Sequence, residues 1–73
     1  MNRPYQDLAE AIIVRGANDW REATLRLKRR PGHKTSREKK AECERFFRSA
    51  WFTELTSIDG ELILRMLEEE MAS

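Results

Sequence analysis

The sequence predicts an all-α protein, a long helical hairpin closed by one or two shorter helices. Apolar residues recur at steps of three and four along most of the chain, which is the period of an amphipathic helix and not the alternation of a strand. Only three glycines and two prolines interrupt the 73 residues, and 40% hydrophobic with 37% charged residues is typical of a small helical domain with a solvated surface. We therefore expect one domain over residues 1–73.

The first helix is predicted from Tyr5 to Arg29 or Arg30. Its apolar stripe comprises Tyr5, Leu8, Ala9, Ile12, Ile13, Gly16, Trp20, Ala23, Thr24 and Leu27. Gly16 lies on this stripe, where it either allows another backbone to approach closely or marks a kink. Pro31 and Gly32 end the helix, because the residue before a proline is displaced from helical geometry.

The second helix is predicted to begin at a capping box formed by Thr35 and Glu38. Its apolar stripe consists of Ala41 or Cys43, followed by Phe46, Phe47, Ala50 and Trp51. Residues 49–56 contain several possible cap residues, so this segment either continues the second helix or forms a separate short one.

The last helix is predicted to begin at a second capping pattern, from Thr56 to Asp59. Its apolar side comprises Ile58, Leu62, Ile63, Met66, Leu67 and Met71. Glu68, Glu69 and Glu70 stand near its C-terminal end, where the helix dipole disfavours negative charge. We expect this end to fray unless a basic surface meets it.

Charge is distributed very unevenly behind a formal net charge of +1. Residues 26–40 carry eight bases and one acid, Glu38, a local surplus of +7. The eight bases are Arg26, Lys28, Arg29, Arg30, Lys34, Arg37, Lys39 and Lys40. The last twenty residues carry six acids and one base, Arg65, giving −5. Because a local field attracts an oppositely charged partner, this asymmetry is the strongest functional signal in the chain.

Residues 44–63 contain Phe-Phe-x-Ser-x-Trp-Phe, then Leu-Thr, an Asp-Gly-Glu turn and Leu-Ile. This run resembles a pattern in short, uncharacterised proteins encoded by prophages and related mobile elements of Gram-positive bacteria. The resemblance covers about the last thirty residues and implies a small helical phage protein, without an activity or catalytic residues. Residues 28–40 are less typical of the pattern, so a contact made there could be particular to this chain.

Residue types that carry catalysis or bind metals do not form a convincing site. Cys43 and His33 lack an oxyanion site and a third orienting group, and together they cannot complete a zinc site. Asp59 and Glu61 are better explained as acids in the first turn of a helix than as an acid–base pair. The sequence therefore predicts a protein that is not an enzyme and that has no cofactor and no metal.

Four aromatic residues, Phe46, Phe47, Trp51 and Phe52, stand at helical spacing. They are interpreted mainly as core, and the alternative is a stacking platform for nucleic-acid bases. Phe52 and Trp20 are the two large aromatic residues expected to be partly exposed.

The eight bases of residues 26–40 are predicted to contact phosphates of a nucleic acid or nucleoprotein, with a strong salt dependence and little sequence preference. Two other interpretations remain open. The segment is a solvated hinge whose charges pair with the acidic last helix, or the second helix is the recognition helix of a helix-turn-helix. Against the latter, the first helix is long and the turn is not compact.

Two rival functions use other surfaces. In the first, the acidic last helix, through Glu61, Glu68, Glu69 and Glu70, binds a host protein as an inhibitor or adaptor, for example an anti-defence factor of the anti-CRISPR kind. In the second, the chain forms a homodimer through Gly16 and the apolar stripe. A single cysteine and the absence of a long apolar run indicate a reducing cytoplasm and no membrane partner. The resemblance implies that this is the cytoplasm of a bacterial host.

Overall fold

The computed structural model describes residues 4–72, and the side chains of residues 6–72. This range contains four helices and no strand, which confirms the all-α prediction. They are α1 (Pro4–Arg29), α2 (Lys34–Phe47), α3 (Ala50–Leu55) and α4 (Gly60–Ala72). The described chain measures 45 × 23 × 22 Å.

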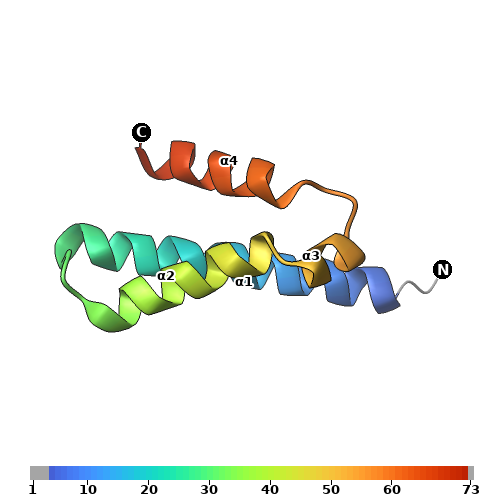
Figure 1. The fold of residues 1–73 in the computed structure, drawn as a ribbon, viewed down its shortest axis with the longest axis horizontal. Helices are drawn as coiled ribbons and strands as arrows, with labels where there is room; N and C mark the ends of the chain where they lie inside the picture. Colours follow the sequence, from blue (N-terminus) through green and yellow to red (C-terminus); the bar gives the residue numbers. More distant parts are fainter. Residues whose placement is uncertain (1–3, 73) are drawn as a thin grey trace.

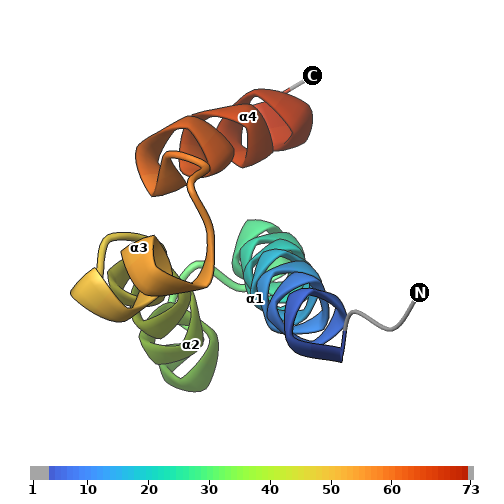
Figure 2. The same ribbon diagram turned by 90° about the vertical axis from the view of Figure 1, so that its right-hand side faces the viewer.

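Helices α1 and α2 form the predicted hairpin and lie side by side, with α3 extending the line of α2 (Figure 1). The chain then reverses, and α4 returns across the hairpin as a second layer, as Figure 2 shows from the end of the molecule. Helix α1 ends at Arg29, as predicted, and a hydrogen bond of 3.0 Å from His33 N–H to the Arg30 carbonyl closes the Pro-Gly turn.

The predicted start of the second helix at Thr35 is wrong. Helix α2 begins at Lys34, and His33 is its N-cap residue. The imidazole Nδ1 of His33 accepts a hydrogen bond of 3.2 Å from Ser36 N–H and lies 2.8 Å from the Ser36 hydroxyl. This arrangement places Thr35 inside the first turn, because the histidine ring supplies the acceptor that a serine or threonine hydroxyl usually provides.

Residues 50–55 form a separate helix, which settles the question left open by the sequence. The Ser49 side chain caps it by accepting a hydrogen bond of 3.1 Å from Phe52 N–H. The predicted cap at Thr56 is wrong, because Thr56 ends α3 and Asp59 precedes α4. The Asp59 carboxylate accepts a hydrogen bond of 3.0 Å from Glu61 N–H. Asp59 therefore caps the positive end of the α4 dipole, three residues after the predicted cap at Thr56.

The core forms where α1, α2, α3 and α4 converge. Its buried members are Trp20, Cys43, Phe47, Phe52, Leu64 and Leu67. Trp20 is 1% exposed, and its indole N–H donates a hydrogen bond of 3.1 Å to the Glu44 carboxylate. Phe52 is fully buried, whereas Trp51 is 54% exposed. The expectation of partly exposed Trp20 and Phe52 is therefore wrong, because α4 covers both residues together with the core.

Phe46 links the aromatic side chains of the core. Its ring centroid lies 5.2 Å from that of Phe47, 5.5 Å from Phe52 and 5.6 Å from Trp51. The last two pairs meet edge to face, which is a favourable arrangement for aromatic quadrupoles. The core interpretation is correct for Phe47 and Phe52, partly correct for Phe46, and wrong for Trp51.

Gly16 allows the close approach that its position on the stripe predicts. A Cβ atom at residue 16 would lie 3.2 Å from the Phe46 ring and 3.4 Å from the Phe47 ring. Helix α1 continues unbroken through this point. Tyr5, the first residue of the predicted stripe, lies outside the residues whose side chains are described.

The predicted apolar side of the last helix is rotated from the observed one. Leu64, which was not assigned to it, is 2% exposed, whereas Ile58, Leu62 and Met66 are 46–60% exposed. Leu67 is buried, and Ile63 and Met71 are partly buried, as predicted. The rotation follows from Gly60, which brings the first turn of α4 against the end of α2.

Of the three glycines, Gly60 lies closest to the backbone of another helix. A Cβ atom at this position would lie 1.8 Å from the Phe47 carbonyl oxygen and 3.3 Å from the Phe52 ring. Backbone cannot move aside as the tip of a flexible side chain can. Position 60 therefore requires glycine for space, and not for its backbone conformation, because no glycine in the described range has a positive φ.

We expect Gly60→Ala to lower the free energy of unfolding by about 3 kcal/mol or more, because the added methyl separates α4 from α2. Whole domains of this size are stable by only about 4 to 11 kcal/mol. Urea denaturation followed by circular dichroism measures the change. Gly32→Ala is the matched control, since no atom lies within 4 Å of its added Cβ, and it should change stability by less than about 1 kcal/mol. Equal effects of the two substitutions would contradict this account.

Thr24 offers a stabilising substitution. Thr24 is 8% exposed, and its hydroxyl has no hydrogen-bond partner within the described part of the chain. Thr24→Val keeps the shape and removes the unsatisfied group, so the free energy of unfolding should rise by about 1 kcal/mol. Thr53→Val is the control, because the Thr53 hydroxyl is exposed and donates to the Ala50 carbonyl. A Thr24→Val protein no more stable than the parent would refute the assignment.

Candidate nucleic-acid interface

The eight bases of residues 26–40 gather around the turn of the hairpin. The last turn of α1 carries Arg26, Lys28 and Arg29, the turn carries Arg30, and α2 carries the other four along its first two turns. In Figure 1 this turn projects beyond the C-terminal end of α4. The local fold therefore concentrates positive charge at one end of the elongated molecule.

Three of these bases are engaged within the chain. Lys28 donates a hydrogen bond to the Met71 carbonyl at the end of α4. Lys39 lies 3.8 Å from an Asp19 carboxylate oxygen, and Lys40 lies 5.3 Å from the centre of the Trp20 ring. These contacts attach them to neighbouring helices and reduce their availability for an outside partner.

The other five form what we call the basic tip: Arg26, Arg29, Arg30, Lys34 and Arg37. All five are exposed. Among residues with described side chains, no carboxylate lies within salt-bridge distance of any of them. The hinge interpretation, in which the acids of the last helix pair with this segment, finds no such ion pair among the described side chains: Lys28 reaches α4 only through the Met71 carbonyl.

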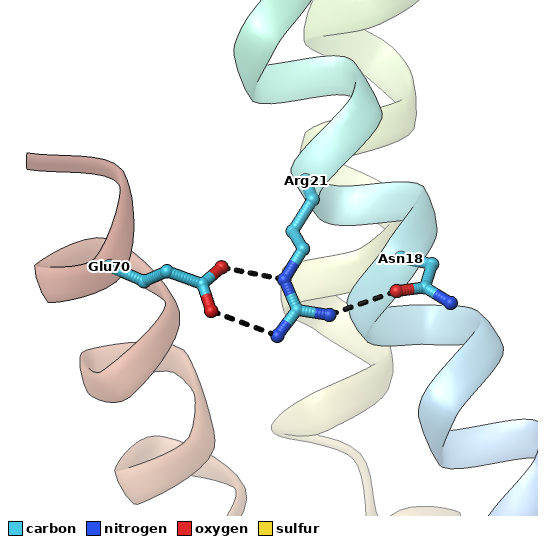
Figure 3. Close-up of polar contacts among 3 residues, drawn as sticks. All are labelled: Asn18, Arg21 and Glu70. Atoms are coloured by element: carbon cyan, nitrogen blue, oxygen red, sulfur yellow. Dashed lines mark hydrogen bonds and ion pairs between the residues drawn. The ribbon is translucent and has the colours of Figure 1, made fainter.

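The acidic end of α4 meets α1 one turn before the basic tip. Arg21 makes a two-pronged contact with Glu70, at 2.6 Å from Nε and 3.2 Å from the second amino group, and its remaining nitrogen donates to Asn18 at 2.9 Å (Figure 3). Together with Lys28, Arg21 places positive charge at the C-terminal end of α4, where the dipole favours it. Arg21 and Lys28 thus form the basic surface without which we expected the end of the last helix to fray.

The remaining acids of α4 divide into two groups. Glu61, at its start, forms an ion pair with Arg48 at the end of α2. Glu68 and Glu69 are exposed, and no ion pair to a described side chain involves them. Of the four acids predicted as an alternative partner surface, two are thus already bound to arginines of the same molecule.

The residues considered for catalysis or metal binding have structural roles. Cys43 is buried in the core, and burial, reinforced by Asp19, raises the pKa of its thiol, which keeps the sulfur protonated. His33 and Asp59 cap helices. Within residues 4–72 no three potential ligands cluster as a metal site would require. Nor does any helix described there combine the length and apolar character needed to cross a membrane.

The stacking-platform interpretation has one exposed candidate, Trp51. It lies near the far end of α2 from the basic tip, beside a depression of about 230 Å³ on the α1–α2 surface. Arg15 and Lys39 line that depression, but so do Asp19 and Glu42, so the local charges balance. Trp51 therefore lies outside the positive surface that a platform would need.

The side-by-side arrangement of α1 and α2 differs from a helix-turn-helix, whose two helices cross steeply. Sequence reasoning missed two residues that shape this region, Arg21 and His33. Arg21 was hidden because it lies outside the basic run, and only the path of α4 brings Glu70 to it. His33 offered a signal in its position three residues before Ser36, but histidine is not a preferred N-cap residue.

Lowering the pH should weaken the contact between α4 and α1 over a defined pH range. The hydrogen bonds from Arg21 lower the pKa of Glu70 below its ordinary value. The pair therefore stabilises the fold fully above the value of an unfolded glutamate, about 4.3, and its contribution is lost as the pH falls through the lowered pKa.

We expect Glu70→Gln to lower the melting temperature near pH 7, and we expect this difference to shrink as the pH falls below the ordinary glutamate value of about 4.3. Thermal unfolding of both proteins across this range measures the effect. Glu69→Gln is the matched control. A melting-temperature difference for Glu70→Gln that persists unchanged in acid would show that the ion pair is not its cause.

Comparisons with known proteins identify no family for this chain. The chain matches no protein-family model, no curated protein and no solved structure.

Proposed function

We propose that this protein binds nucleic acid or a nucleoprotein through the basic tip, without catalysing a reaction, in the cytoplasm of a bacterial host. The observation that carries the proposal is that five exposed cations at one end of the molecule lack ion pairs with the described side chains. Cations that are not neutralised internally release counterions when they contact phosphates, and this release drives association.

The shape of the basic tip favours contact with the phosphate backbone over the reading of bases. A hairpin turn presents arginine and lysine side chains from two helix ends, and such contacts position a protein on nucleic acid without identifying the sequence. The dipolar charge distribution adds orientation, because the acids Glu68 and Glu69 on α4 would be repelled by the same polyanion.

A second candidate is a protein-binding inhibitor or adaptor, which includes anti-defence factors of the anti-CRISPR kind. It is favoured by the outer side of α4, where Leu62 and Met66 are exposed on the helix that also carries Glu68 and Glu69. Such a surface suits a partner with a basic, partly apolar groove. The two candidates use opposite charges, so substitutions separate them.

We expect a fluorescently labelled DNA duplex to bind with a salt slope, d log K/d log [salt], of about −4.5, since five contacts each contribute about −0.9. The triple substitution Arg29→Gln, Arg30→Gln and Arg37→Gln should reduce the magnitude of the slope by about 2.7. Anisotropy titrations at several salt concentrations measure both values.

The matched control is the triple substitution Arg15→Gln, Arg45→Gln and Arg65→Gln, which removes the same charge from exposed sites away from the basic tip. Equal losses in the two triple variants would show that total charge, and not the basic tip, governs binding. Absence of binding at low salt would refute the proposal. Glu68→Gln with Glu69→Gln should leave DNA binding intact, whereas the second candidate requires these acids.

A further inference from the structure

A depression of about 540 Å³ opens on the flank of the basic tip. It is lined by the last turns of α1, the hairpin turn and the N-cap residue of α2: Glu22, Leu25, Arg26, Arg29, Arg30 and His33. Three arginines and a histidine thus line one concave surface together with a single acidic residue. With the imidazole neutral, the charges of these groups sum to +2, three arginines less one glutamate.

The hydrogen bonds of His33 identify which ring nitrogen carries the proton. Ser36 N–H donates to Nδ1, and a nitrogen that accepts a hydrogen bond has no proton of its own. The proton of the neutral ring is therefore on Nε2. Ser36 is 5% exposed, so this contact is shielded from water. Nε2 itself has no hydrogen-bond partner among the residues described here.

These groups match the chemistry of a phosphate. Guanidinium groups donate paired N–H bonds to phosphate oxygens, and three arginines are among the residues that line this depression. A phosphate has several oxygens and can accept bonds from these groups and from the neutral Nε2–H together. Glu22 is the one lining group that repels an anion, and it lies on the α1 side of the depression.

We infer that this depression is a phosphate subsite of the proposed nucleic-acid interface, in which His33 serves as a neutral donor beside Arg26, Arg29 and Arg30. The inference rests on the proposed function and adds a specific position to it. The basic tip attracts the polyanion over a distance, whereas the depression holds one phosphate group. The phosphate belongs to the nucleic-acid backbone or is a free anion, and the two sources can be distinguished.

His33→Ser is the informative substitution. Serine is among the best N-cap residues, so α2 keeps its cap while the imidazole donor is removed. We expect duplex DNA to bind about tenfold more weakly, the loss typical of a hydrogen bond to a charged group. The salt slope should stay unchanged, because the donor is neutral, and the melting temperature should stay within a few degrees of the parent.

Double-mutant cycles locate the subsite. Arg29→Gln should reduce the magnitude of the salt slope by about 0.9, and its loss of affinity should be coupled to that of His33→Ser, because both groups contact the same phosphate. Lys34→Gln, outside the depression, should reduce the slope similarly but add independently to His33→Ser. Glu22→Gln should tighten binding, a gain that a purely structural role for this surface would not produce.

His33 is the single histidine of the chain, so its ring resonances in a nuclear magnetic resonance spectrum are assigned without ambiguity. Duplex DNA should shift them in the wild-type protein. If inorganic phosphate at matched ionic strength shifts them equally, the subsite stands and accepts the free anion; if only DNA shifts them, the backbone is the source.

Two results would overturn the inference while leaving the proposed function intact: DNA binding unchanged in His33→Ser, or additive effects of His33→Ser and Arg29→Gln. If the wild-type protein failed to bind DNA at low salt, the proposed function would be refuted. If inorganic phosphate still shifted the His33 resonances, the depression would remain a phosphate site without a nucleic-acid role.

Discussion

The contact between Gly60 and the end of α2 is the constraint on which the rest of this fold depends. A Cβ at residue 60 would lie only 1.8 Å from the Phe47 carbonyl oxygen, so the first turn of α4 rests directly on backbone. From there α4 can only return across the hairpin, where Leu64 and Leu67 cover Trp20 and Phe47. A chain this small buries a limited share of its surface, so this second layer provides a large part of the core.

The same return path determines the electrostatics of the surface. By lying along α1, the end of α4 brings Glu70 to Arg21 and the Met71 carbonyl to Lys28 in the last turn of α1. The acids are thereby held at the side of the molecule, and the basic tip projects past them (Figure 1).

Helix boundaries show where local rules were adequate and where they were not. The end of α1 was predictable because Pro31 acts on its immediate neighbour. The N-terminal caps of α2 and α4 were not, because several acceptors compete within a few residues and the winner depends on the path of the loop. His33 displaced Thr35, and Asp59 displaced Thr56. Ser49, one of several possible cap residues in this part of the sequence, forms the cap that separates α3 from α2.

The sequence by itself determined the helical class, the hairpin turn, the apolar stripe of α1 and the separation of positive from negative segments, since each of these depends on spacing along the chain. Only the tertiary structure decided that Trp20, Phe52 and Leu64 are buried while Trp51 is exposed, because periodicity defines a face without saying which edge of that face a fourth helix will cover. It also decided which bases lack an internal ion pair, because that depends on where α4 ends in space.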